Sequence, residues 1–444
     1  MELENGLPFK FYFENVDKFG RILPNNLSID EISNYNSKCS DDYHWNHFEM
    51  ERNTEKLLGT VYRGYVETSK LSTTDINNDD VLAYLCESYT PPVYYGDNFI
   101  KNISKEALLK LKEGKLIVIF NWFGEPLYDT TFNIFIENMC NENDIDISNF
   151  FILTSANNIK NTSKINYISD HFFLSNSAKS LKTFLKNKVV EGWEFEYQNE
   201  IVDYDVFNFK KTKHFLSLNR QVNRPHRYSL GLLLEKYNLW DLGYFTFLNL
   251  PEEQTQAIEC MSQSDFDSYD DIHTKFTSKL PIEIDTIFLK DKSTMSSFPT
   301  STTYFKKNYQ DTIINIVTET TFTNNVVFIS EKTFHPIINL QPFIILASNG
   351  QLAELKRLGF KTFSHIIDES YDDEEDSHKR FKKASDEILR LSKMSIDDMN
   401  ELFLSCKDIC IYNRNHLLSF TKYNVFENSL QKIKKIWNSK EKRF

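Results

Sequence analysis

The chain has 444 residues, which is more than one domain usually needs, and we therefore expect two domains. The hydrophobic content of 41%, with 37 Phe and 22 Tyr, excludes global disorder, while only 12 Gly and the lack of a Walker or G-x-G-x-x-G pattern exclude those phosphate loops. A formal net charge of −12 argues against a nucleic-acid coat protein but leaves room for a local basic pocket.

The cysteines and the N-terminus both indicate a cytoplasmic protein. The first ten residues contain Glu2 and Glu4 without a long apolar run, so no signal peptide is expected, and no stretch reaches the ~20 apolar residues of a membrane span. No CxxC pair and no zinc-like spacing occurs among the six cysteines, which we interpret as reduced thiols. They are Cys39, Cys86, Cys140, Cys260, Cys406 and Cys410.

The first half of the chain predicts alternating strands and helices. Residues 1–100 carry no clear pattern. A helix is then expected over 104–113, followed by continuous apolar runs at 115–120 and 150–155, which are typical of parallel strands covered on both faces. A further helix is expected over 175–188, so the half reads as a βαβ arrangement.

The second half repeats this alternation after a charged linker near 189–212. Strands are predicted at 214–218, 312–317 and 342–347, and helices at 224–237, from Ser330, at 352–358 and from about 376 onward. We therefore expect an α/β protein with one Rossmann-like domain over 1–205 and a second over 206–420. A C-terminal helix over 421–444 would be able to cross back to the first domain.

Charged residues gather where a strand of the second domain ends and a helix begins. Glu319 follows the strand at 312–317, and Ser330 looks like a helix N-cap, which places Glu331 and Lys332 in the first turn. Ligands of open α/β sheets bind at the carboxyl ends of strands, and free N–H groups at a helix start suit a diphosphate. Lys332 adds positive charge there, and Glu331 can accept hydrogen bonds from hydroxyls.

A second charged group follows the strand at 214–218. Arg220, Arg224 and Arg227 fall within eight residues, and guanidinium groups pair well with phosphate oxygens. Such cations can stabilise a departing nucleoside diphosphate without a metal ion. The Asp-x-Asp pairs at 144–146 and 203–205 follow no predicted strand, so no metal site is expected.

These residues carry a resemblance to known families. The run from Asn315 to Thr320, followed by Ser330-Glu-Lys and Pro342, resembles the donor motif of α1,3-fucosyltransferases. The run from Ser330 to Tyr371 is similar to glycosyltransferase-like proteins of tailed phages and large viruses, and the similarity spans roughly 213–395. It implies a GT-B fold, in which two Rossmann-like domains face each other across a cleft.

The resemblance also implies an inverting hexosyl or pentosyl transfer, with the nucleotide sugar as co-substrate and no cofactor. Lys332 with Arg227 or Arg224 would hold the diphosphate, Glu331 the ribose and Glu319 the transferred sugar. Thr320 stands where the fucosyltransferases have Asn, which puts GDP-fucose in doubt and leaves UDP-linked and other GDP-linked sugars open.

An inverting transferase needs a base that takes the proton of the acceptor hydroxyl. Gly124-Glu125 follows the strand at 115–120 and resembles a Gly-Glu pair of the fucosyltransferases, so Glu125 is the candidate catalytic base.

Three functions stay open at this point. The acceptor can be a glycan, lipid or protein hydroxyl. It can instead be a hydroxymethylated base in viral DNA, in the cytoplasm of an infected host cell, for which the lysine-rich stretch 101–115 would offer a basic surface. The chain can also be a non-catalytic module that binds a sugar or nucleotide. No obligate protein partner is evident from the residues.

Overall fold

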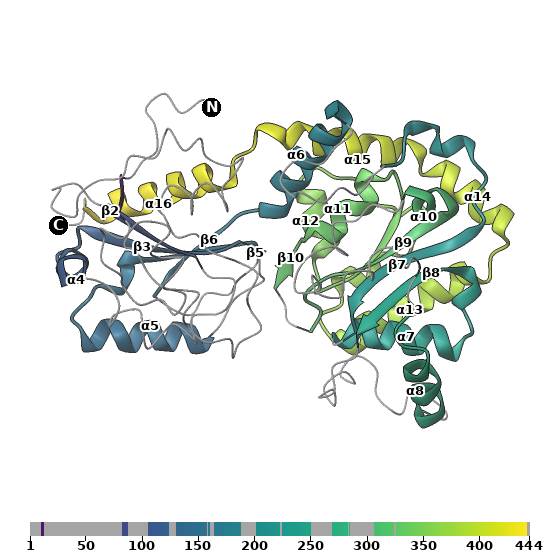
Figure 1. Cartoon of the computed structure of the whole chain (residues 1–444), viewed down its shortest axis with the longest axis horizontal. Helices are drawn as coiled ribbons and strands as arrows, with labels where there is room; N and C mark the ends of the chain where they lie inside the picture. The colour runs from purple at the N-terminus through teal and green to yellow at the C-terminus, as the bar shows by residue number, and fades with distance from the viewer. Residues whose placement is uncertain are drawn as a thin grey trace, which may run out of the picture. The chain divides into compact units, whose positions relative to one another are not determined.

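The computed structural model forms two compact units, Met1–Phe172 with Tyr423–Phe444 and Phe173–Lys422. All strand pairings within the five-stranded sheet of the first unit and the four-stranded sheet of the second are parallel (Figure 1). This confirms the expected α/β class with two Rossmann-like parallel sheets. The structure describes residues 10–12, 82–87, 105–123, 130–157, 159, 164–187, 201–222, 224–249, 269–282, 284, 306–323 and 326–441.

The first unit is built on a sheet of order β1-β2-β3-β4-β6. Its strands are β1 (Lys10–Tyr12), β2 (Leu82–Glu87), β3 (Leu116–Trp122), β4 (Phe150–Thr154) and β6 (Asn166–Ser169). Ile117 and Ile119 of β3 pack into one apolar cluster, whereas Val118 and Phe120 pack into another. Alternate residues of a strand point to opposite faces, so a strand covered on both faces reads as a continuous apolar run.

Helices cover both faces of this sheet (Figure 1). α4 (Lys105–Lys112) and α5 (Thr130–Glu142) contribute Leu111 and Ile136 to the cluster of Val118. α16 (Val425–Glu441) contributes Phe426 and Leu430 to the cluster of Ile117. The C-terminal helix therefore forms part of the first unit, although it is separated from the rest of that unit by the whole second unit in sequence.

Asp170 holds α16 in this place. The buried carboxylate follows β6 and accepts a hydrogen bond from the Tyr423 hydroxyl at 2.5 Å, and its other oxygen lies 3.0 Å from Nζ of Lys432. Tyr423 is the first residue of the chain after its return from the second unit. A buried carboxylate with both oxygens engaged fixes this return more strongly than an exposed ion pair would.

The two units divide between Phe172 and Phe173, ahead of the stretch 189–212 in which the sequence places the linker. The reason is α6 (Phe172–Asn187). Its apolar residues Leu174, Ala178 and Leu181 are buried in the same cluster as the second sheet. The sequence of an amphipathic helix shows which of its residues are buried, but it does not show into which of two neighbouring cores they pack.

The second sheet has the order β11-β9-β7-β8. Its strands are β7 (Lys213–Gln221), β8 (Gly243–Asn249), β9 (Thr312–Thr318) and β11 (Phe343–Leu346). Its helices are α7 (Pro225–Lys236), α8 (Tyr269–Ser278), α10 (Lys306–Asp311), α11 (Glu331–Ile338), α12 (Gln351–Arg357), α13 (Ser377–Ser392), α14 (Ile396–Ser405) and α15 (Lys407–Ser419). The short strand β10 (Val327–Phe328) precedes α11.

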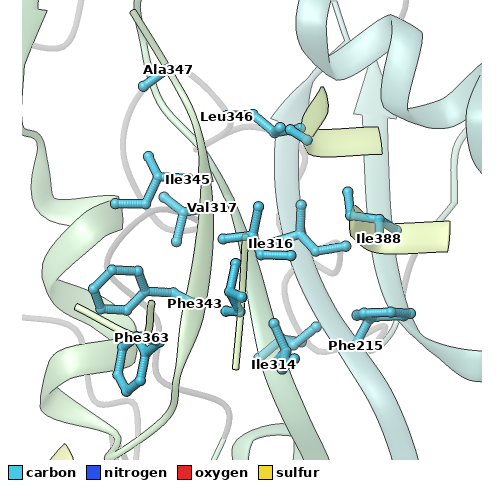
Figure 2. Packing of buried hydrophobic residues seen from close by; sticks show 14 of the residues in the cluster. Phe215, Ile314, Ile316, Val317, Phe343, Ile345, Leu346, Ala347, Phe363 and Ile388 are labelled. Atoms are coloured by element: carbon cyan, nitrogen blue, oxygen red, sulfur yellow. The ribbon is translucent and has the colours of Figure 1, made fainter. Parts of the chain in front are cut away.

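The core of the second unit is continuous across this sheet. Figure 2 shows Ile314 and Ile316 of β9 gathered with Phe215 of β7 and Ile388 of α13. All seven residues of β9 are buried, as the apolar run at 312–317 predicts for a central parallel strand. In the described parts of the chain, no helix is long and apolar enough to span a bilayer.

Lys211 is a lysine enclosed in this core, with an exposed fraction of 1%. Its ammonium donates to the main-chain oxygens of Tyr309 and Gln310, at 3.1 and 2.7 Å. Burial lowers the pKa of Lys211 to about 7, against the opposing effects of Asp311 and Cys410.

We predict that Lys211 makes the protein more stable as the pH rises from 7 towards 10. In this window an unfolded chain, whose lysine pKa is 10.5, binds a proton that the folded chain does not, so raising the pH favours the folded state. The contribution is on the order of 1 kcal/mol for each pH unit. Urea unfolding of the wild type and of Lys211→Met at several pH values measures it. Equal slopes in the two proteins would mean that folded Lys211 keeps its charge.

Candidate functional site

The second sheet changes its winding direction between β7 and β9. The chain passes from β7 through α7 to β8 on one side, whereas β9 and β11 continue on the other side. In open α/β sheets ligands bind outside the carboxyl ends of the strands at such a switch point. The two charged groups predicted from the sequence both follow these strands, so the fold brings them to one edge of the sheet.

The segment after β7 carries the arginines. Arg224 is the N-cap residue of α7, is exposed, and makes no side-chain cap bond. Arg227 is buried, and its Nη2 donates to the main-chain oxygens of Thr318 and Glu319, both at 3.3 Å, which ties α7 to the end of β9. Burial, together with the charge of Arg224, lowers the pKa of Arg227 to about 10. The backbone of Arg220 lies in β7, and its side chain lies outside the described part of the structure.

His226, in the first turn of α7, is buried beside the same strand end. Its Nε2 lies 2.8 Å from the main-chain oxygen of Glu319, and its ring stacks on Phe322 with centroids 5.0 Å apart. Burial first, and then the charge of Arg227, hold the pKa of His226 well below its usual range. The imidazole is therefore neutral. The sequence alone suggests only a packing role for this residue.

Glu319 is completely buried, and its carboxylate is surrounded by donors from the start of α11. One oxygen accepts from the main-chain N–H of Ser330 at 3.0 Å and from the Thr333 hydroxyl at 2.5 Å. The other accepts from the Ser330 hydroxyl at 2.5 Å and from the main-chain N–H of Thr320 at 3.2 Å. The Ser330 hydroxyl in turn accepts from the N–H of Lys332, as expected of an N-cap.

This arrangement differs from the sequence-based expectation that Glu319 contacts the transferred sugar. Both oxygens are occupied by protein donors, but the main-chain N–H groups among them belong to Ser330 and Thr320 and not to the first turn of α11. Asp372, by contrast, caps α12 directly, since it accepts from the N–H groups of Leu352 and Ala353 at 2.9 and 3.0 Å. Glu319 therefore holds Ser330 in place at the start of α11, and the Ser330 hydroxyl caps the helix.

Glu331 and Lys332 form an ion pair of 2.9 Å at the start of α11. Their side chains are 19% and 24% exposed, so both are partly shielded but still reach solvent. Burial alone would raise the pKa of Glu331, but Lys332 and His335 hold it below its usual value. Glu331 is therefore ionised at neutral pH and able to accept hydrogen bonds from hydroxyl groups.

Arg380 of α13 adds a further positive charge that the sequence did not suggest, because α13 reads as a solvated polar helix. Its buried guanidinium donates to the main-chain oxygens of Ala347 and Phe322 and lies 4.7 Å from the centre of the Phe322 ring. Its charge helps to lower the pKa of His226, after burial and the nearer Arg227. Arg380 thus belongs to the electrostatic surroundings of the switch point.

Cationic side chains gather at this edge. Among the described residues, Arg224, Arg227 and Arg380 lie close enough to act on the pKa of His226, and Lys332 is paired with Glu331 at the start of α11. The whole chain carries −12, so the positive charge is local. Such a concentration of cations at a strand end is suited to a doubly negative ligand.

The other predicted residues are placed as follows. Glu125 lies outside the described residues. Asp146 caps the short 3-10 helix Ile147–Asn149 and accepts from the N–H of Ser148 at 2.8 Å, and Asp203 and Asp205 are exposed at the start of the 3-10 helix Tyr204–Asn208. No group of three or more His, Cys, Asp or Glu with a geometry for a metal ion occurs among the residues that the structure describes.

No protein-family model matches the chain, and no curated protein matches it. Similar solved structures include a UDP-forming α,α-trehalose-phosphate synthase from Burkholderia xenovorans, with 9% identity and a TM-score of 0.32, over 80% of this chain and 74% of that chain. An α,α-trehalose 6-phosphate synthase from Burkholderia multivorans has 9% identity and a TM-score of 0.35, over 87% of this chain and 74% of that chain. At such low identity and TM-scores, these similarities assign neither a substrate nor a site residue to this chain.

Proposed function

We propose that this protein is a glycosyltransferase of the GT-B class that binds a nucleotide-diphosphate sugar in its second unit. The observation that carries the proposal is the gathering of the described cations Arg224, Arg227, Lys332 and Arg380 at the switch point of the second sheet. A nucleoside diphosphate sugar carries about two negative charges in its diphosphate and many hydroxyl groups. The partly exposed Glu331 beside Lys332 supplies an acceptor for those hydroxyls.

The proposed chemistry is inverting and independent of a metal ion. Negative charge builds up on the departing nucleoside diphosphate, and Lys332 and Arg224 are the cations with solvent access that can stabilise it. Arg227 is hydrogen-bonded to the end of β9 and contributes its positive charge from a buried position. The fucosyltransferase-like motif supports this reading, with a UDP-linked or GDP-linked sugar as donor.

A glycan or another small hydroxyl acceptor is favoured over a hydroxymethylated DNA base. A DNA groove on the first unit would need a continuous basic surface. The lysines of α4 and those of α16 lie on helices that cover opposite faces of the first sheet, so they do not line one groove in the described part of the first unit. Retention of the protein on duplex DNA at two salt concentrations tests this: retention that falls steeply with salt would favour the DNA acceptor.

A thermal-shift screen against UDP-, GDP- and CMP-linked sugars tests the donor site, because a ligand that binds only the folded state raises its stability by mass action. We expect stabilisation by at least one UDP- or GDP-linked sugar and a weaker effect of CMP-linked sugars, which have a single phosphate. No stabilisation by any of them would contradict the proposal. Release of nucleoside diphosphate in the presence of acceptors separates an enzyme from a non-catalytic binding module.

For the catalytic base we predict that Glu125→Gln binds the donor as the wild type does but loses transfer by roughly 100-fold or more. The amide has nearly the same shape as the carboxylate but cannot accept the acceptor proton. Donor affinity by calorimetry and initial rates of transfer measure the two effects separately. Full transfer activity in the variant would exclude Glu125 as the base.

A further inference from the structure

We infer that Nδ1 of the His226 ring accepts a hydrogen bond from a hydroxyl group of the bound nucleotide sugar. The inference rests on the proposed function and deepens it, because it names a residue that distinguishes one hydroxyl-bearing ligand from another. Its evidence is the hydrogen bonding, burial and charge around the ring.

The hydrogen bond to Glu319 fixes the tautomer of the His226 ring. Nε2 lies 2.8 Å from the main-chain oxygen of Glu319, and a carbonyl oxygen can only accept, so Nε2 carries the hydrogen. Burial and the charge of Arg227 hold the pKa of His226 well below its usual range, and the charges of Arg224 and Arg380 act in the same direction. The ring is therefore neutral, and Nδ1 is a bare acceptor.

Nδ1 of His226 is an unused acceptor in the described structure. Nδ1 is buried and has no hydrogen-bond partner in the described structure, and the whole residue is 1% exposed. Phe322 covers a face of the ring, so that face offers no donor. Buried polar atoms without partners are rare in folded proteins, and each one calls for a ligand, a trapped water or a functional reason.

The ligand group that fits Nδ1 of His226 must be a hydrogen-bond donor. The oxygens of a diphosphate carry no hydrogen at neutral pH, so they would repel the lone pair of Nδ1, whereas Arg224 and Lys332 suit them. A hydroxyl group donates and is abundant in both ribose and sugar. His226 lies in the first turn of α7, two residues after the N-cap Arg224, whose side chain makes no cap bond. The residue is therefore placed to read a hydroxyl close to the phosphates.

Two substitutions distinguish the roles of the two ring nitrogens of His226. In His226→Gln the side-chain amide can still donate to the Glu319 oxygen in the manner of Nε2 but offers no acceptor at the position of Nδ1. In His226→Asn a polar atom stays near Nδ1, and the bond to Glu319 is lost. We expect the Gln variant to melt close to the wild type and the Asn variant to melt clearly lower.

Binding of UDP, 2′-deoxy-UDP, UDP-glucose and GDP-mannose is then measured by calorimetry. We expect His226→Gln to lose about 3- to 10-fold in affinity for ligands that carry the hydroxyl it reads. A loss for UDP-glucose and GDP-mannose but not for UDP assigns a sugar hydroxyl. A loss for UDP that is absent for 2′-deoxy-UDP assigns the ribose. Both results support the inference.

Equal affinities of the wild type and His226→Gln for all four ligands would overturn the inference and leave the donor site standing. A wild type that binds none of them contradicts the proposed function, and the inference with it. Should the Gln variant fail to fold, ¹⁵N NMR of the wild-type imidazole decides the question. Nδ1 must shift when UDP-glucose is added, and an unchanged Nδ1 resonance would mean that a trapped water is its only partner.

Discussion

Replacing Glu319 by alanine is expected to destabilise the second unit by about 3 kcal/mol or more, because several buried donors lose their acceptor at once. The Ser330 hydroxyl, the Thr333 hydroxyl and the Ser330 N–H all donate to this carboxylate. None of these donors has access to water, since Ser330 is 1% and Thr333 0% exposed. Chemical denaturation with a probe in the second unit measures the change.

Glu354→Ala is the matched control for this prediction. Glu354 lies in the same unit and is also mostly buried, but it forms an ion pair with Arg357, whose side chain is 64% exposed. Loss of a pair with an exposed cation costs less than leaving several buried donors without an acceptor, so this variant should lose clearly less stability than Glu319→Ala. A Glu319→Gln variant that keeps full stability but loses affinity only for the sugar part of the donor would show instead that Glu319 contacts the sugar.

β3, β4, β7, β9 and β11 were predictable because parallel strands buried on both faces appear in the sequence as apolar runs. β1, β2 and β6 of the first sheet were not predicted. β8 was not predicted, since it lies at the edge of its sheet, where Phe245 and Phe247 are buried and Tyr244 and Thr246 are only half-buried. Such a short alternation between polar neighbours is a weak signal.

The sequence predicts a candidate site at the end of β9, but it does not predict which groups surround Glu319. A carboxylate just beyond a strand end, such as Glu319, gives the same sequence pattern whether it binds a ligand or accepts hydrogen bonds from several protein donors. The difference depends on Ser330 and Thr333, which lie 11 and 14 residues further along the chain and reach Glu319 only in the fold. The same is true of Arg380, which comes to the site from a helix beyond the last strand of the sheet.

Lys332→Ala is expected to weaken binding of a nucleotide-diphosphate sugar by roughly 30-fold or more, which corresponds to a charge-assisted hydrogen bond of about 2 kcal/mol. The substitution removes one positive charge from the candidate site and leaves Glu331 without its partner at 2.9 Å. Because Lys332 is 24% exposed, the fold should tolerate the loss with little change in melting temperature. Calorimetry with the donor found in the thermal-shift screen measures the affinity.

Lys356→Ala removes the same charge from the same unit and is therefore the control for a general effect of charge. Lys356 is 52% exposed and pairs with Glu369, and its loss should leave donor affinity unchanged. A double substitution of Lys332 and Glu331 separates direct attraction of the ligand from the cost of an unpaired Glu331, since restored affinity in the double variant would point to the unpaired carboxylate. If Lys332→Ala and Lys356→Ala bind the donor equally well, the diphosphate does not lie beside α11, and the cations after β7 alone would have to hold it.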